Sequence, residues 1–159
     1  MRVVDASSIV LAWDTYPIDQ FPPFWEWIDS TIQSAKMVMA EPNFDEVGHV
    51  SPELQSWLLP RLTRLPVDNK VMVRALQINT VLGTTNDNYH PDGVDENDIL
   101  CIATAQSNNC GLLADESPQP ALPQNMRRYK IPAVCNLGKV AVSCLNLNQY
   151  IRQSGVVFN

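Results

Sequence analysis

Carboxylates in this chain stand at the ends of short apolar segments. Asp5 follows one such segment, Asp98 begins another, and Glu46 comes after a third. Asp115 and Glu116 directly follow a fourth. Because the carboxyl ends of parallel strands share one edge of a sheet, these side chains are expected to meet there. Clustered carboxylates suit hard divalent cations such as Mg²⁺ and Mn²⁺, and a bound cation of this kind can support phosphoryl chemistry by activating water.

Each of these acids also has a purely structural interpretation. Asp98 can cap a helix or place negative charge in its first turn. Asp5 can begin a strand-to-helix turn, and Glu46 can be a solvated helix side chain. Asp115 and Glu116 can be turn formers. It is the coincidence across four separate segments that favours a shared site over four unrelated turns.

The segments that carry the acids alternate between apolar runs and helical patterns, which predicts parallel βαβ units. Strands are expected over 2–4, 37–40, 111–114 and 140–145, and helices after residue 6, over 24–35, from 42, over 52–59, 67–82, from 98, from 131 and over 147–153. The predicted fold is a three-layer α/β/α sandwich around a central, mostly parallel sheet, with residues 1–159 forming one domain.

Two local features follow from the same patterns. Ser7 or Ser8 is expected to cap the first helix, since serine is a preferred N-cap residue. In the helix over 67–82, the three-to-four residue spacing predicts that the inward-facing residues are Met72, Ala75, Leu76 and Leu82.

Composition is that of an ordinary globular domain, with 45% hydrophobic and 18% charged residues in 159. The net charge of −6 argues against non-specific binding to a polyanion. It does not exclude a nuclease, because a metal would neutralise acids in the site and a local basic patch can remain. The start of the chain lacks the pattern of a secretory signal, and no apolar run approaches the ~20 residues of a membrane span. A cytoplasmic location is therefore expected.

The sequence does not indicate a zinc site, a nucleotide-binding loop or a nucleophilic catalytic site. The four cysteines form no CxxC pair and the two histidines have no zinc-ligand spacing, so buried free thiols are expected. The glycine-rich motifs of nucleotide-binding loops are absent, and no nucleophile motif accompanies the histidines.

With these residues in order, the chain resembles the PIN-domain nucleases. The matching segments are Val3-Val4-Asp5-Ala6-Ser7-Ser8, Glu46, Asn97 to Ala105, and Leu112-Leu113-Ala114-Asp115-Glu116. Further segments resemble a PIN-like subfamily catalogued as a bacterial and archaeal domain of unknown function: Tyr16-Pro17, Phe21-Pro22, Trp25, Lys130 to Cys135, and Cys144 to Leu147. The resemblance covers essentially the whole chain.

The resemblance implies an Mg²⁺- or Mn²⁺-dependent endoribonuclease that cleaves RNA phosphodiesters. Many such proteins are the toxin of a type II toxin–antitoxin pair (VapC-like), silenced by a small antitoxin protein, and homodimers are common among them. Carried over by position, Asp5, Glu46, Asp98 and Glu116 would hold the metal, with the Ser7 hydroxyl supporting them.

The fourth acid departs from the family pattern. The family usually shows Thr-x-acid at this strand exit, and here Ala114 stands at the threonine position. The matching acid is then Glu116, with Asp115 as the alternative and Asp95 as a further nearby carboxylate. Losing the threonine hydroxyl removes one hydrogen bond of the kind that orients metal ligands.

Binding of RNA would need positive charge near the same edge. The main candidates are Arg127, Arg128 and Lys130, with Tyr129 available for base stacking. Arg61 and Arg64 are further candidates. The alternative is a solvated basic turn. At the level of the whole protein, the alternative to a nuclease is a catalytically weak or inactive PIN-like module that binds RNA or protein.

Overall fold

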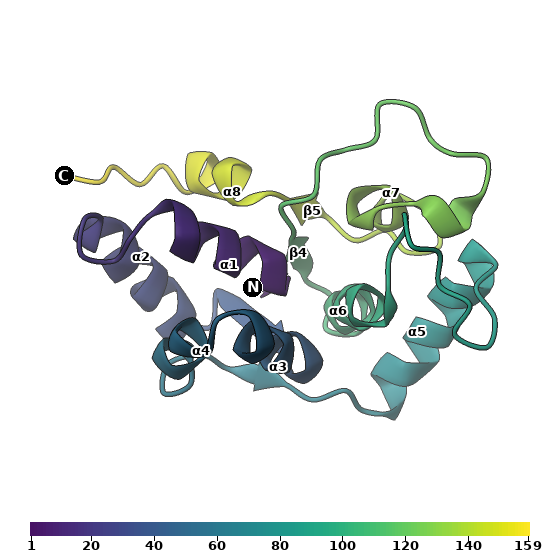
Figure 1. Ribbon diagram of the computed structural model, residues 1–159, viewed down its shortest axis with the longest axis horizontal. Helices are drawn as coiled ribbons and strands as arrows, with labels where there is room; N and C mark the ends of the chain where they lie inside the picture. The colour runs from purple at the N-terminus through teal and green to yellow at the C-terminus, as the bar shows by residue number, and fades with distance from the viewer.

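A five-stranded parallel sheet lies between two layers of helices in the computed structural model, which describes residues 1–159 (Figure 1). The strands are β1 (Arg2–Val4), β2 (Met37–Ala40), β3 (Arg64–Leu65), β4 (Gly111–Leu113) and β5 (Cys144–Leu145). Their order across the sheet is β3-β2-β1-β4-β5, and every pairing is parallel. The predicted three-layer α/β/α sandwich is confirmed.

The helices divide between the two faces of the sheet (Figure 1). One face carries α1 (Ala6–Thr15), α2 (Pro22–Gln33), α3 (Glu41–Val50), α4 (Pro52–Leu58) and α8 (Leu147–Ser154). The other carries α5 (Asn69–Leu82), α6 (Glu96–Ser107) and α7 (Ile131–Cys135), preceded by a 3₁₀ turn over Met126–Arg128. Right-handed crossovers explain this division, because the chain first moves from β1 outward to β3 and then reverses through β4 to β5. None of these helices combines the length and the apolar character needed to cross a membrane.

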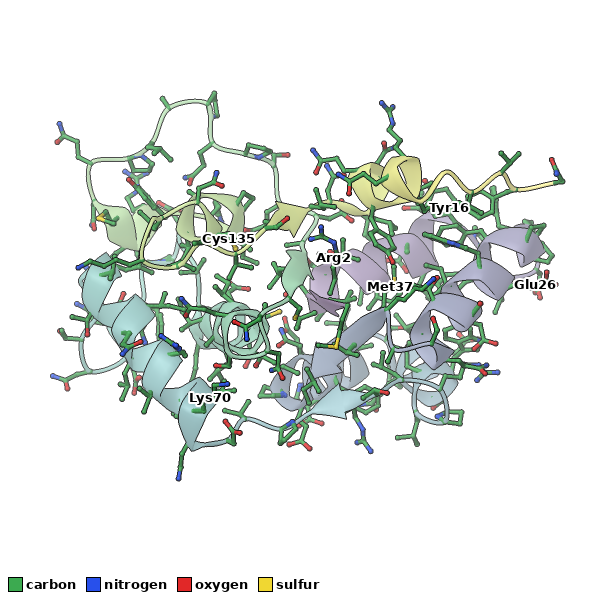
Figure 2. The ribbon with its side chains drawn as sticks, turned by 180° about the vertical axis from the view of Figure 1, so that it is seen from behind. Arg2, Tyr16, Glu26, Met37, Lys70 and Cys135 are labelled. Atoms are coloured by element: carbon green, nitrogen blue, oxygen red, sulfur yellow. The ribbon has the colours of Figure 1, made fainter.

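Successive side chains of the central strands pack into two separate hydrophobic cores, one on each face of the sheet. Val3 and Leu112 pack among the side chains of α5, α6 and α7, whereas Val4 and Leu113 pack against the helices of the opposite face. Successive strand residues point to opposite faces, so two buried neighbours serve two cores. The reverse view in Figure 2 shows side chains filling both spaces, with Cys135 on the α7 side and Met37 on the α2 side.

The direction of winding reverses between β1 and β4, which lie side by side in the sheet. At such a switch point the connections leave toward opposite faces, and a crevice opens at the carboxyl ends of the strands. Asp5 directly follows β1, and Asp115 follows β4 with Ala114 between them. The topology therefore places the predicted acids on both sides of this crevice.

The prediction for α5 was right for Ala75 and Leu82, which are buried, and wrong for Met72 and Leu76, which are 43% and 63% exposed. Val71 and Ile78 complete the buried face. Both sets follow the three-to-four residue spacing of a helix, so periodicity alone could not choose between them. Packing of α5 against α6 decides in favour of the smaller and β-branched set.

Two further predictions of local structure need correction. Asp5, not Ser7 or Ser8, caps α1, with its side chain accepting a hydrogen bond from the Ser7 N–H. The last strand was expected over 140–145 and is confined to β5, because Ala141 adopts a left-handed backbone with φ of 51° that interrupts the extended conformation. The two-residue strand β3 was not predicted at all.

Candidate active site

Asp5 is buried at the exit of β1, with an exposed fraction of 4%, and both of its carboxylate oxygens have donors. The Ser7 N–H donates to Oδ2 at 3.1 Å, and the Ser7 hydroxyl donates to the same oxygen. Asn43 Nδ2 lies 3.5 Å from Oδ1. Burial raises the pKa of Asp5, the hydrogen bonds from Ser7 lower it, and the negative charge of Glu116 raises it again. The carboxylate is thus held in one orientation at the switch point.

Glu46 reaches the same region from α3, half-buried. Asn97, at the start of α6, donates from Nδ2 to Glu46 Oε2 over 3.3 Å. The pKa of Glu46 is raised by burial first and then by the negative charges of Asp5 and Asp95. Glu46 is therefore near enough to Asp5 and Asp95 for their charges to disfavour its ionisation.

Asp98 has a structural role and a place among the acids at the same time. Asp95 is the N-cap of α6, and the two residues form a reciprocal capping box: the Asp98 N–H donates to Asp95 Oδ1 at 3.0 Å, and the Asp95 N–H donates to Asp98 Oδ2 at 2.9 Å. Burial raises the pKa of Asp98 to about 8, with further increases from the charges of Asp95, Asp5 and Glu116. The capping box confirms the structural interpretation of Asp98, and the raised pKa leaves its role in a shared site as a prediction.

Glu116 completes the group from beyond β4. Its Oε2 accepts a hydrogen bond from the Ile131 N–H at 2.7 Å, which ties it to the first turn of α7. Lys130 Nζ lies 3.9 Å from Oε1. The charge of Glu116 also raises the pKa of both Asp5 and Asp98, so this carboxylate interacts electrostatically with them. We refer to Asp5, Glu46, Asp98 and Glu116 as the acidic cluster.

Asp115 stands apart from the acidic cluster in its interactions. Its Oδ2 is buried and has no hydrogen-bond partner, and burial raises its pKa. None of the four clustered acids contributes to that shift. Ala114, at the position where the PIN pattern has threonine, is buried with only a methyl group. Between the two candidates for the fourth acid, the electrostatic contacts favour Glu116.

A groove of 460 Å³ runs from the acidic cluster along α1 and α3. It is lined by Ala6, Ser7, Val10, Leu11, Asp14, Glu46, Val50, Asp115 and Glu116. Its volume is within the range of ligand-binding pockets. No lysine or arginine lines it, so its polar surface consists of carboxylates and one serine.

The donors of the acidic cluster fit a hard divalent cation. All are carboxylate oxygens, and the pKa values of Asp5, Glu46 and Asp98 are raised in part by mutual repulsion that a cation would relieve. As the side chains stand, no group of three or more acidic, histidine or cysteine side chains is close enough to hold an ion together. Mg²⁺ usually keeps several waters and binds through only one or two carboxylates, so this arrangement remains compatible with it.

The basic residues predicted to bind RNA are divided in their contacts. Arg127 donates from Nε to the backbone carbonyl of Asn88 at 2.9 Å, and Arg128 pairs with Asp92 at 3.5 Å. Both therefore fasten the loop that precedes α6. Lys130 alone contacts an acid of the cluster.

Tyr129 does not provide the stacking surface suggested by the sequence. Its side chain is only 9% exposed and packs in the core between the sheet and α6. Its carbonyl accepts a hydrogen bond from the Val94 N–H at 3.1 Å. Tyr129 anchors the loop before α6, and its buried ring is not accessible for stacking on a nucleobase.

Two amides that contact the cluster were not singled out from the sequence. Asn43 is fully buried on α3 and lies three residues before Glu46, so both stand on one side of the helix. Asn97 directly precedes Asp98. A buried amide one turn from a candidate acid is the signal that could have identified Asn43.

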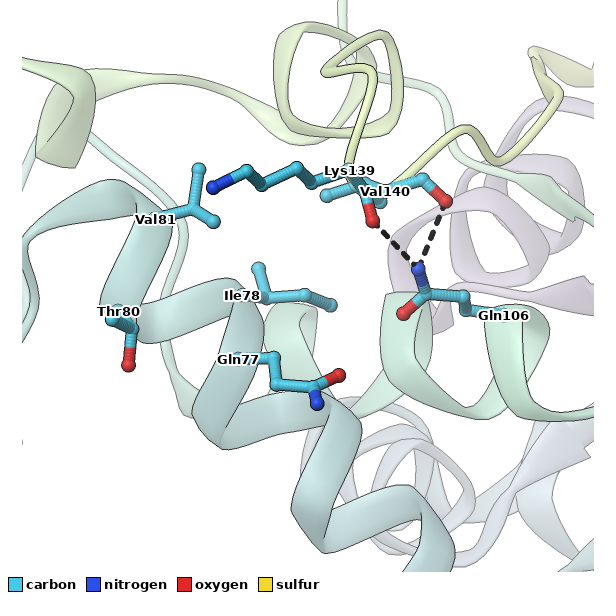
Figure 3. Close-up of a pocket in the computed structure, with 7 residues that line it drawn as sticks. All are labelled: Gln77, Ile78, Thr80, Val81, Gln106, Lys139 and Val140. Carbon is cyan, nitrogen blue, oxygen red and sulfur yellow. Dashed lines mark hydrogen bonds between the residues drawn. The ribbon is translucent and has the colours of Figure 1, made fainter.

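Another hollow, of 280 Å³, lies between α5, α6 and the turn before β5 (Figure 3). Figure 3 shows the Gln106 side chain spanning toward that turn, where Nε2 donates to the carbonyls of Lys139 and Val140, each at 3.0 Å. This hollow contains no carboxylate and lies away from the carboxyl ends of the strands. It offers none of the chemistry of the acidic cluster.

With this geometry established, we compared the chain with known proteins. Residues 3–158 match the model of a family described as "Domain of unknown function (DUF4411)". The chain belongs to this family. No curated protein matches the DUF4411 protein in sequence. Among solved structures it is similar to the crystal structure of VapBC2 from Rickettsia felis bound to a DNA fragment from their promoter, with a TM-score of 0.58 and 13% identity over 91% of this chain and 97% of that one. At this identity the similarity establishes a PIN-like fold.

Proposed function

We propose that this DUF4411 protein is a metal-dependent endoribonuclease that cleaves RNA phosphodiesters with Mg²⁺ or Mn²⁺. The observation that carries the proposal is the convergence of Asp5, Glu46, Asp98 and Glu116, from four separate elements, at the switch point of a PIN-like sheet. Clustered carboxylates with raised pKa values destabilise a fold when they ionise, and a function that requires them explains their presence.

In this proposal Asp5 and Asp98 would hold the cation, assisted by Glu116 and Glu46. Such an ion, when bound, would supply an activated water and stabilise the leaving oxygen. Ser7 orients Asp5 through its N–H and hydroxyl, and Asn97 orients Glu46. The Lys130 ammonium, 38% exposed beside Glu116, can bind a phosphate of the substrate at the edge of the site.

The biological role proposed is that of a toxin in a type II toxin–antitoxin pair, acting on single-stranded or loop RNA whose bases are accessible. The similarity to VapBC2 supports this role at the level of fold. A small antitoxin that covers the site would be the partner, and a homodimer is compatible with the exposed side chains Met72, Val73 and Leu76 on α5.

The experiment that tests the proposal is calorimetric titration of Mn²⁺ into the wild type and Asp98→Asn, followed by cleavage of single-stranded RNA. We expect binding by the wild type and its loss in the variant. Asp5→Asn is expected to abolish metal-dependent cleavage. Full cleavage by Asp5→Asn would show that the acidic cluster is not the active site.

A second candidate function is a PIN-like module that binds RNA or protein without cleaving it. It is favoured by Ala114, which lacks the hydroxyl expected at this position, and by the absence of a preformed three-ligand group. Such a module would hold its target in EDTA and would cleave nothing with Mn²⁺. A nuclease would cleave RNA with Mn²⁺ and would lose this activity in EDTA.

A further inference from the structure

The groove beside the acidic cluster extends well past the carboxylates that would hold a metal. Ser7, Val10, Leu11 and Asp14 line it from α1. Their spacing of three, four and seven residues places them along one face of the helix. At 1.5 Å per residue, Asp14 lies about 10 Å from Ser7 along the axis of α1. The groove thus has a second end at Asp14, beyond the end that Glu46 and Glu116 line.

The walls between these ends are apolar and open to solvent. Leu11 on α1 is 49% exposed, and Val50 on α3 is 65% exposed. Both line the groove, as does the half-buried Val10. A phosphate would be drawn to lysine or arginine, and neither lines this groove. Exposed aliphatic side chains on two helices suit the flat face of a nucleobase, which proteins hold between apolar side chains.

Asp14 provides polar chemistry at the far end. Its carboxylate is exposed and forms no ion pair, and no side-chain hydrogen bond engages it. An ionised carboxylate only accepts hydrogen bonds, so a ligand in this end of the groove must donate them. Two adjacent donors would satisfy both oxygens at once.

We propose that Asp14, Leu11 and Val50 form a subsite for the guanine base of a nucleotide next to the scissile phosphate. The subsite rests on the proposed function, which places that phosphate at the acidic cluster. Guanine presents N1–H and the N2 amino group side by side on its Watson–Crick edge, and a carboxylate accepts both in charge-assisted hydrogen bonds. Adenine and cytosine place a ring acceptor beside their amino group, and uracil flanks its N–H with two carbonyls. A carboxylate repels these acceptors.

The test compares binding of fluorescently labelled RNA hexamers, all uridine except one central residue that is guanosine, inosine or adenosine. Inosine differs from guanosine only by lacking the N2 amino group. Fluorescence anisotropy with Mn²⁺ is expected to show at least about tenfold tighter binding of the guanosine hexamer than of the inosine hexamer, the effect of one charge-assisted hydrogen bond. In Asp14→Asn the two hexamers are expected to bind alike, because the amide turns a donor toward the base.

Asp19→Asn is the matched control. Asp19 is also exposed, lies just past the end of α1, and does not line the groove. The substitution removes the same charge, so any general effect of charge on RNA affinity appears in both variants. Only Asp14→Asn is expected to change the ratio of guanosine to inosine affinity. Circular dichroism confirms that both variants are folded.

The outcomes separate this inference from the proposed function. A guanosine preference that Asp14→Asn removes supports the guanine-binding subsite. If no RNA is cleaved as well, the nuclease proposal fails and the subsite stands only as a binding site, not as one beside a scissile phosphate. RNA cleavage without a guanosine preference, or with a preference that persists in Asp14→Asn, overturns the subsite and leaves the nuclease proposal in place. No binding of any hexamer also overturns the subsite.

Discussion

Replacing Asp98 by asparagine is expected to stabilise the protein when metal is absent. Asparagine has nearly the same shape, and its side-chain oxygen can still accept the hydrogen bond that the Asp95 N–H gives to Asp98 Oδ2 at 2.9 Å. The capping box is therefore retained. What the substitution removes is a carboxylate whose ionisation is opposed by burial and by Asp95, Asp5 and Glu116.

The magnitude follows from the pKa of Asp98, which rises from 3.8 to about 8 on folding. The folded state keeps its proton more tightly than the unfolded state, so stability falls as pH rises from about 4 to about 8 and is constant above that range. Each pKa unit corresponds to about 1.4 kcal/mol, which gives an upper bound of about 6 kcal/mol. Asp98 is partly exposed and water screens its neighbours, so we expect about 2 kcal/mol at pH 7.5.

The assay is thermal unfolding of the wild type and Asp98→Asn in EDTA, repeated between pH 4 and pH 8. For a chain of this length, 2 kcal/mol corresponds to a rise in Tm of about 4–8 °C. The difference between the two proteins is expected to be small at pH 4 and largest near pH 8. Asp68→Asn is the control, because Asp68 caps α5 by accepting from the Val71 N–H at 2.9 Å and has no acidic cluster around it. Its effect is expected to stay within about 0.5 kcal/mol.

A lower Tm for Asp98→Asn, or a difference that does not change between pH 4 and pH 8, would refute this reasoning. Either result would mean that Asp98 contributes to stability only through its capping box with Asp95. Adding Mn²⁺ provides an independent check, since a cation bound to the acidic cluster stabilises the wild type by about 2.7 kcal/mol at one hundred times its Kd. The variant is expected to lose that gain.

Ser7→Ala removes the hydroxyl that donates to Asp5, so Mn²⁺ affinity measured by calorimetry is expected to fall 10- to 100-fold. Ser8→Ala is the control. The Ser8 hydroxyl is buried without a partner, so its loss is expected to leave that affinity unchanged. Lys130→Ala is expected to weaken RNA binding by a similar factor for every sequence and to reduce the salt dependence of the binding constant by about one ion; an unchanged salt slope would remove Lys130 from the interface. Leu112→Ala, at a fully buried position on the sheet, is expected to cost about 2–5 kcal/mol in urea unfolding, and a cost below about 1 kcal/mol would contradict the packing described for β4.

The sequence was sufficient for the architecture because its strongest patterns are local. Strands β1 and β2 were predicted with their observed bounds, and the apolar segment before Asp115 was placed within one residue of β4. Strands too short to show a pattern were lost, as with β3 at Arg64–Leu65. The opposite error occurred at Ala141. The apolar pattern predicted a strand through this residue, but its left-handed backbone interrupts the extended conformation.

The sequence by itself determined that carboxylates would stand at the exits of buried strands, because local apolar patterns predict where strands end and the residue types that follow are known. Only the tertiary structure decided which of them face one another. It brought Glu116 within electrostatic reach of Asp5 and Asp98, buried Tyr129, and placed Leu11 and Val50 along one groove. These relations depend on how helices pack across the sheet, and packing is set by side chains far apart in the sequence.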